Sequence, residues 1–223
     1  MRRRTQMSWD DDVVANVSDE LFWDPKVDSA AIAVSAKDGA VTLRGTVGSL
    51  REKREARKAA QRVFGVNWVD DELKVRLMDG QGRADSELRG FVLQALTLDS
   101  LVPATVDAKV ADGFVTLTGT VDWQYQRDEA DLVASSIAGA LDVFNEIEIT
   151  QPTPNAADTE ESIKKAFKRN AALDADALRI STLDGAVTVK GKVSSWSEHD
   201  EAIAAAWAAP GVTSVRDDLT IKY

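Results

Sequence analysis

The stretch DGAVTLRGTV at residues 38–47 decides the fold of this chain, because it occurs three times. It returns as DGFVTLTGTV at residues 112–121 and as DGAVTVKGKV at residues 184–193. The copies begin 74 and 72 residues apart (38 to 112, then 112 to 184), and such a period indicates tandem copies of one small domain. We therefore expect three similar repeats within the 223 residues.

Each copy is typical of a β-hairpin with a type I′ turn. An Asp-Gly pair between two alternating apolar runs favours this two-residue turn, because both turn residues need positive φ. The turn also fixes which residues face each other, and in the first copy it pairs Ala36 with Val41 and Val34 with Leu43. The other predicted pairs are Lys37 with Ala40, Ile32 with Gly45, Val110 with Val115, Ala108 with Leu117, Val106 with Gly119, Thr182 with Val187, Ile180 with Val189 and Leu178 with Gly191.

In every copy we expect the two turn residues and one glycine of the second strand to have structural roles. These positions are Asp38, Gly39, Gly45, Asp112, Gly113, Gly119, Asp184, Gly185 and Gly191. Since a branched residue faces the strand glycine each time, we expect a helix backbone or a large side chain to fill the space that the missing Cβ leaves.

A helix is predicted on each side of every hairpin. The first helix of each repeat has apolar residues at helical spacing: Val13, Val14, Val17 and Leu21; Leu88, Phe91, Val92, Ala95 and Leu96; Ile163, Ala166, Phe167 and Leu173. The second helix begins at capping boxes, Ser49 with Glu52 and Ser195 with Glu198, and ends at a left-handed Gly65, Gly139 or Gly211. Its apolar stripe is Ala56, Ala60, Val63 and Phe64 in the first repeat and Ala130, Ala134 and Ile137 in the second.

A final apolar strand completes each repeat, for example at Leu73, Val75 and Leu77. A short strand-helix-strand crossover favours a right-handed connection between parallel strands. The sequence therefore predicts an α+β fold of three tandem α-β-β-α-β domains, each a three-stranded mixed sheet with both helices on one face. We place the domains at residues 8–77, 84–150 and 157–223, after a disordered tail at residues 1–7.

The composition narrows the possible functions. The chain has no Cys, one His and a net charge of −10, which excludes thiol chemistry and makes nucleic acid a poor partner. No nucleophile with a base and no phosphate loop appears, so we expect no enzyme activity, catalytic residue, metal or cofactor. His199 is predicted to be exposed and without partners. The arginines at residues 2–4 are followed by no apolar run, so we expect a cytoplasmic protein, at most peripheral to a membrane.

The stretch LFWDPKVD at residues 21–28, followed by Ile32, Val34 and the Asp-Gly hairpin, resembles the BON domain, which is named from bacterial osmotic-stress and nodulation proteins. The resemblance covers nearly the whole chain, once in each repeat. It implies the α-β-β-α-β fold and non-enzymatic work. Members of the family bind anionic phospholipid, protect against osmotic shock or bind potassium.

A basic stripe on the second helix of the first repeat is the candidate lipid-binding site. It consists of Arg51, Arg54, Lys58 and Arg62, nearly opposite the apolar stripe. Each basic residue near an anionic membrane contributes roughly 1 kcal/mol, so the stripe supplies a few kcal/mol at most. The alternative is a solvated helix face, since Glu52 and Glu55 are interleaved with the basic residues.

Two further groups are candidates for binding. Asp70, Asp71 and Glu72 offer oxygen ligands to a cation, but consecutive residues of a strand point to alternate faces. Trp123 and Trp196, near the start of the second helix in the second and third repeats, are candidate contacts for a protein partner.

Two hypotheses follow from these residues. The first is a stress-associated binding or adaptor module that contacts an anionic membrane surface through the basic stripe of the first repeat, or a protein partner. The second is a cation-responsive module for potassium or calcium. The sequence does not indicate an oligomeric state.

Overall fold

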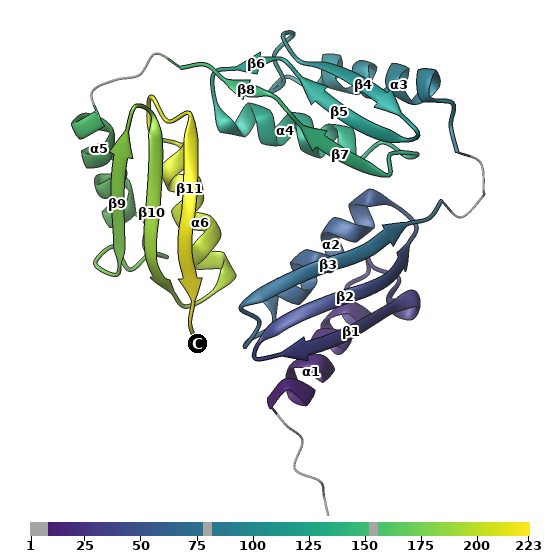
Figure 1. Ribbon diagram of the computed structural model, residues 1–223, viewed down its shortest axis with the longest axis horizontal. Coiled ribbons are helices and arrows are strands. Elements are labelled where there is room, and N and C mark those ends of the chain that lie inside the picture. The colour runs from purple at the N-terminus through teal and green to yellow at the C-terminus, as the bar shows by residue number, and fades with distance from the viewer. Residues whose placement is uncertain (1–8, 78–81, 152–155) are drawn as a thin grey trace, which may run out of the picture. The chain divides into compact units, whose positions relative to one another are not determined.

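The computed structural model describes residues 9–77, 82–151 and 156–223 (Figure 1). The chain divides after residue 81 into two compact units. The first unit contains one copy of the repeat, and the second unit contains two. The tail predicted at residues 1–7 lies outside the described residues, as do residues 78–81 and 152–155 between the predicted domains.

The first repeat contains two helices and three strands, with a single 3₁₀ turn (η1, Ser29–Ala31) before the first strand. Strand β2 lies at the centre of the sheet, antiparallel to β1 and parallel to β3. The elements are α1 (Trp9–Trp23), β1 (Ile32–Lys37), β2 (Ala40–Val47), α2 (Leu50–Arg62) and β3 (Trp68–Val75).

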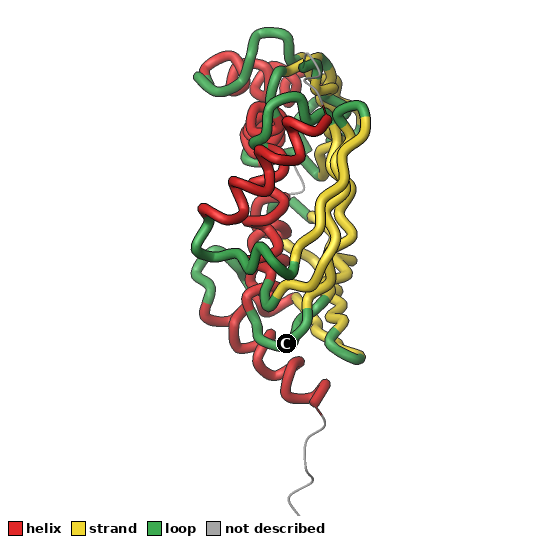
Figure 2. The backbone as a smooth tube through the Cα atoms, turned by 90° about the vertical axis from the view of Figure 1, so that its left-hand side faces the viewer, coloured by secondary structure: helices red, strands yellow, loops and turns green. Residues whose placement is uncertain are grey.

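The second and third repeats follow the same order of helices and strands, except that two strands of the second repeat are each divided in two. The second consists of α3 (Asp85–Leu98), β4 (Asp107–Ala111), β5 (Phe114–Thr118), β6 (Thr120–Val121), α4 (Gln124–Ser135), β7 (Asp142–Asn145) and β8 (Glu148–Ile149). The third consists of α5 (Ala156–Arg169), β9 (Leu178–Leu183), β10 (Ala186–Val193), α6 (Trp196–Trp207) and β11 (Ser214–Ile221). In each repeat the two helices lie on one face of the sheet (Figure 2), which confirms the predicted α+β fold of three repeats.

The hairpin registers agree with the turn rule. The pairs predicted in the first and third repeats all occur, from Lys37 with Ala40 to Leu178 with Gly191. The turn residues have the expected positive φ, for example 52° at Asp38 and 79° at Gly39. In the second repeat the β4–β5 pairing ends at Asp107 with Thr118, so the predicted pair of Val106 with Gly119 lies just outside it.

The second repeat differs from the prediction of one continuous three-stranded sheet. Its central strand is divided into β5 and β6, and its last strand into β7 and β8. The parallel register is the same on both sides of the gap, with Leu117 opposite Asn145 and Thr120 opposite Glu148. Positive φ at Gly119 (126°) does not by itself explain the gap, since Gly45 (135°) lies within the continuous β2, whereas in the last strand the Asn145 side chain bonds to the backbone of Arg127.

The strand glycine of each hairpin fits against a carbonyl oxygen. A Cβ added at Gly45, Gly119 or Gly191 would overlap the oxygen of Ala31, Thr105 or Ala177, the residue before the first strand or one earlier. The occupant is therefore main chain that leads into the first strand; it is the predicted helix backbone only in the first repeat, and in no repeat is it a large side chain. In the first repeat this carbonyl belongs to the last residue of η1.

Two aromatic residues assigned to apolar helix stripes are exposed. Phe64 lies beyond the end of α2, because Val63 is already extended (φ −77°, ψ 130°), and 64% of Phe64 is exposed. Phe91 of α3 contacts the Arg83 guanidinium, 4.6 Å from the ring centroid, instead of the core. The cores consist of aliphatic residues such as Val17, Leu43 and Ala60.

Two glycines of the second repeat give opposite predictions. Gly119→Ala should destabilise the repeat by about 1–3 kcal/mol, since it combines positive φ with overlap of a carbonyl oxygen. Gly90→Ala, the matched control, should stabilise it by about 0.5–1 kcal/mol, because Gly90 lies inside α3 with open space around it. Hydrogen exchange of residues 114–118 in the full chain measures both effects, and equal effects of the two substitutions would contradict this account.

Candidate functional site

The basic stripe lies on α2, whose start is held by the predicted capping box. Ser49 Oγ accepts a hydrogen bond from Glu52 N (3.1 Å), and Glu52 Oε2 accepts one from Gly48 N (2.7 Å). The other carboxylate oxygen of Glu52 accepts from Asp28 N (2.8 Å), which fixes the loop before η1 against α2. The small residues of the helix, Ala56, Ala59 and Ala60, are buried, so the basic residues face outward.

Arg62 ties α2 to the end of α1. Its Nε atom donates to Glu20 Oε1 (2.9 Å) and its Nη2 atom to Asp24 Oδ2 (2.8 Å). The Arg62 guanidinium, together with the backbone N–H of Lys26, holds the pKa of the Asp24 carboxyl below its ordinary value. Since Arg62 holds two carboxylates of its own repeat, its charge is largely compensated, and it contributes least to any external anion site.

The other members of the stripe differ in their exposure. Arg51 and Lys58 are exposed, while Arg54 is half-buried. Lys58 lies 4.0 Å from Glu55, and Glu55 pairs more closely with Lys26 (2.9 Å). The structure therefore leaves Arg51 and Lys58 as the most accessible cations of the predicted site.

An exposed aromatic pair at the end of α1 was not a predicted site. Phe22 and Trp23 are 69% and 77% exposed, and their rings meet edge to face at 5.6 Å. They lie directly before Asp24, the partner of Arg62. Two large consecutive aromatics at a helix end are a signal that could have identified them, because neighbouring helical residues point in different directions and cannot share one buried face.

The three consecutive acids do not form a single cluster. All lie in β3, where exposure alternates, and Asp71 is less exposed than its two neighbours. Arg44 binds Glu72 through two hydrogen bonds (2.6 and 3.0 Å), and Asp71 Oδ1 accepts from Leu73 N (3.0 Å). Within the described part of the chain, no group of three or more His, Asp or Glu side chains is arranged to hold a metal ion.

The two candidate partner tryptophans are both half-buried. Trp123 is the N-cap residue of α4 and lines a cavity together with Trp207. Trp196 is the first residue of α6, and its ring contacts the His199 imidazole edge to face, with 5.0 Å between centroids.

His199 corrects a prediction, because it is neither exposed nor without partners. Its side chain is only 14% exposed, and its two ring nitrogens lie 2.9 Å from Asp200 Oδ1 and 2.7 Å from Asp217 Oδ2. The hydrogen bond with Asp200, then that with Asp217, raises the pKa of His199 against the opposing effect of burial. The sequence did not show this because Asp217 lies on β11, which α6 contacts only in the folded repeat.

The repeats and their hairpins define a family. The BON domain model matches residues 10–76, 84–151 and 155–223, so nearly the whole chain is covered. The chain belongs to the BON domain family and carries three copies of the domain.

A curated relative and two solved structures can be compared with the chain. It is 34% identical to the osmotically-inducible protein Y of Escherichia coli over 143 residues, 62% of this chain and 71% of the relative. Two structures of CdsD, a structural protein of the type III secretion system of Chlamydia trachomatis, match at 13% and 12% identity, each over 95% of this chain and over 92% and 98% of theirs. Both have a TM-score of 0.27 and carry no argument here. None of the described helices has the length and apolar character needed to span a bilayer.

The pKa of His199 can be measured directly, because it is the only His in the chain. Proton NMR titration should give a value above 6.5, and Asp217→Asn should lower it. Because the folded pKa is raised, the contribution of His199 to stability is complete below pH 6.5 and is lost as the pH rises through the folded value.

The matched control for this titration is Asp218→Asn. Asp218 pairs with Lys190 and Arg216 instead of with the imidazole, so this substitution should leave the His199 pKa nearly unchanged. A wild-type value at or below 6.5, or an equal response to both substitutions, would refute the assignment.

Proposed function

We propose that this protein is a non-enzymatic binding module of the osmotic-stress response that contacts anionic phospholipid through α2 of its first repeat. The similarity to the osmotically-inducible protein Y supports the role in osmotic stress. A chain built from three BON domains supports a binding role rather than catalysis.

The observation that carries the lipid contact is the exposure of Arg51 and Lys58 on the outer face of α2. Both lie on the face opposite the buried alanines, where a flat anionic surface could approach without unfolding the repeat. A few cations at roughly 1 kcal/mol each give weak, salt-sensitive association. The exposed ring of Trp23 would add apolar contact at the headgroup level, because it lies at the end of α1, which Arg62 ties to α2, and its indole combines an apolar body with a polar N–H.

The alternative of a potassium- or calcium-responsive module has less support. The carboxylates proposed for it, Asp70, Asp71 and Glu72, alternate along β3, and Arg44 already binds Glu72. A cation would have to displace this arginine and collect oxygen ligands from both faces of the strand.

Charge reversal tests the lipid proposal. Arg51→Glu with Lys58→Glu should abolish co-sedimentation with vesicles that contain phosphatidylglycerol, and wild-type binding should fall steeply between low and physiological salt, because the contact is electrostatic.

The control for this experiment is Lys165→Glu with Lys168→Glu in α5. It changes the net charge of the chain by the same amount on another exposed helix and should retain binding. If both double variants lose vesicle binding equally, net charge alone explains the binding and the site on α2 is wrong. If the wild type does not bind vesicles at low salt, the lipid proposal is wrong.

A further inference from the structure

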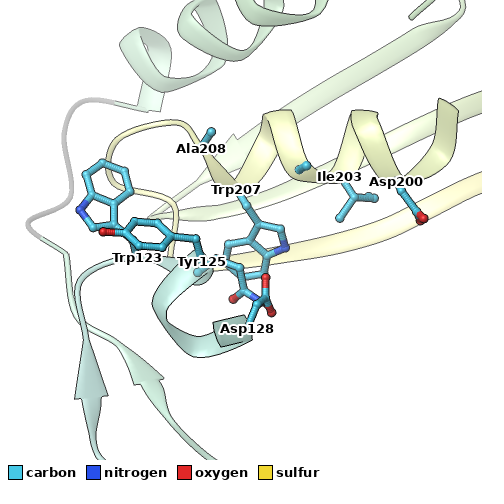
Figure 3. A pocket seen from close by; sticks show the side chains of 9 residues that line it. Trp123, Tyr125, Asp128, Asp200, Ile203, Trp207 and Ala208 are labelled. Atoms are coloured by element: carbon cyan, nitrogen blue, oxygen red, sulfur yellow. The ribbon is translucent and has the colours of Figure 1, made fainter. Parts of the chain in front are cut away.

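The second compact unit contains a cavity of about 410 Å³ between α4 and α6 (Figure 3). A cavity of this size is large enough for a small organic molecule. Its walls carry three aromatic rings, an amide and two carboxylates, from Trp123, Tyr125, Trp207, Gln124, Asp128 and Asp200. Apolar residues of α6 complete the lining.

Packing and hydrogen bonds hold the aromatic walls in place. Trp207 is partly buried against the core of the third repeat, and Figure 3 shows its ring extending from α6 toward Asp128 of α4. Gln126 Oε1 accepts a hydrogen bond from Trp123 N (3.0 Å), which fixes the turn from which the Trp123 and Tyr125 side chains project. Trp207 is therefore held by packing and the backbone at Trp123 by a hydrogen bond, while the Tyr125 side chain is 53% exposed.

Gln151 connects the two repeats that form the walls. Its side-chain amide donates to the Asp122 carbonyl oxygen, and its Oε1 atom accepts from Gly211 N (2.6 Å). Asp122 directly precedes Trp123, and Gly211 follows the end of α6. The same side chain thus holds the start of α4 close to the end of α6.

The polar groups of the cavity are acceptors. Gln124 Nε2 donates to Asp128 Oδ1 (2.7 Å), while the buried Oε1 atom of Gln124 accepts no hydrogen bond from the described residues. Asp128 is exposed at the rim of the cavity, yet desolvation by the surrounding side chains raises the pKa of its carboxyl despite this hydrogen bond and the nearby Arg127. Asp200 already faces the His199 imidazole, so Asp128 is the more available carboxylate.

We propose that this cavity binds a small organic cation that carries a methylated ammonium group, held among the three aromatic rings with its charge balanced by Asp128. Aromatic faces attract cations, and methyl groups give the cation an apolar surface that packs on the rings. A metal ion would need several oxygen ligands, and a primary ammonium presents N–H groups rather than the apolar methyl surface that packs on aromatic rings. The second repeat as a whole favours a cation, because residues 84–150 hold 12 acidic and 3 basic side chains.

The probe for this site is choline, compared with its neutral isostere 3,3-dimethylbutan-1-ol. Isothermal titration calorimetry of the full chain should show saturable binding of choline and of tetramethylammonium, and at least about tenfold weaker binding of the alcohol, because it lacks the charge that the rings and Asp128 recognise. Equal binding of choline and the alcohol, or no saturable binding of either cation, would overturn the proposal.

Three variants test the assigned side chains. Trp207→Leu and Asp128→Asn should each weaken choline binding by about tenfold, while Glu129→Gln, which removes one charge from the same helix outside the cavity lining, should leave it unchanged. Because Trp207→Leu could also disturb the third repeat, hydrogen exchange of β10 and β11 must match the wild type for that result to count. If Asp128→Asn binds choline as tightly as the wild type, the assigned role of the carboxylate is wrong.

The methylated ammonium group could belong to a free solute or to the headgroup of a choline lipid. If the protein co-sediments with phosphatidylcholine vesicles and free choline abolishes this co-sedimentation, the ligand is the lipid headgroup. If the protein binds choline but does not co-sediment with the vesicles, the ligand is a free solute. The site is independent of the basic stripe, so Arg51→Glu with Lys58→Glu should bind choline like the wild type, and loss of choline binding in that variant would contradict the assignment to α4 and α6.

Discussion

Every repeat depends on the contact between one strand glycine and one backbone carbonyl. Gly45, Gly119 and Gly191 adopt positive φ, and the oxygen that leads into the first strand occupies the space where a Cβ would lie. The Asp-Gly turn fixes the hairpin at its closed end, and this contact fixes it at its open end. A slip of one residue would turn the apolar side chains toward solvent, so two fixed points determine which face of the sheet receives the helices. The positions of α2, α4 and α6, and therefore of every candidate site, follow from this register.

The sequence predicted the fold well because its decisive signals are local. Turn chemistry, capping boxes and the period of apolar residues act over a few positions, and together they define each element of the repeat.

The predictions were wrong where the surroundings of a side chain come from another element. Phe64 follows the helical period but lies beyond the last helical residue, and His199 meets Asp217 only after β11 has paired with β10. The basic stripe could be located from spacing alone, but the pairing of Arg62 with Asp24 and Glu20 could not. The aromatic cavity could not be predicted from the sequence. Of its three rings only Trp123 was a candidate, and Trp207 belongs to another repeat.

The three repeats show how one fold can present different surfaces. The residues that determine the fold are the turn, the strand glycine and the small or aliphatic core side chains, and these recur in all three copies. The outer faces of the second helices do not contribute to the core and are free to differ. In the first repeat this face carries Arg51, Arg54 and Lys58, while the corresponding helix of the second repeat carries Asp128 and Asp131. Tandem duplication of a fold that leaves one helix face unconstrained therefore gives a single chain several chemically distinct surfaces.

The two proposed sites should also respond differently to the ionic strength that changes in osmotic stress. Arg51 and Lys58 face solvent, where salt screens charges over about 8 Å at physiological ionic strength, so their attraction for an anionic surface weakens as salt rises. The cavity between α4 and α6 is partly enclosed by aromatic rings, so salt screens the charge of a bound cation less than it screens exposed charges, and the packing of methyl groups on the rings is not electrostatic. Rising salt would therefore weaken the contact through the first repeat more than the binding of an organic cation by the second compact unit. A chain with both kinds of site could exchange one kind of partner for the other as the solvent changes, with no conformational change in any repeat.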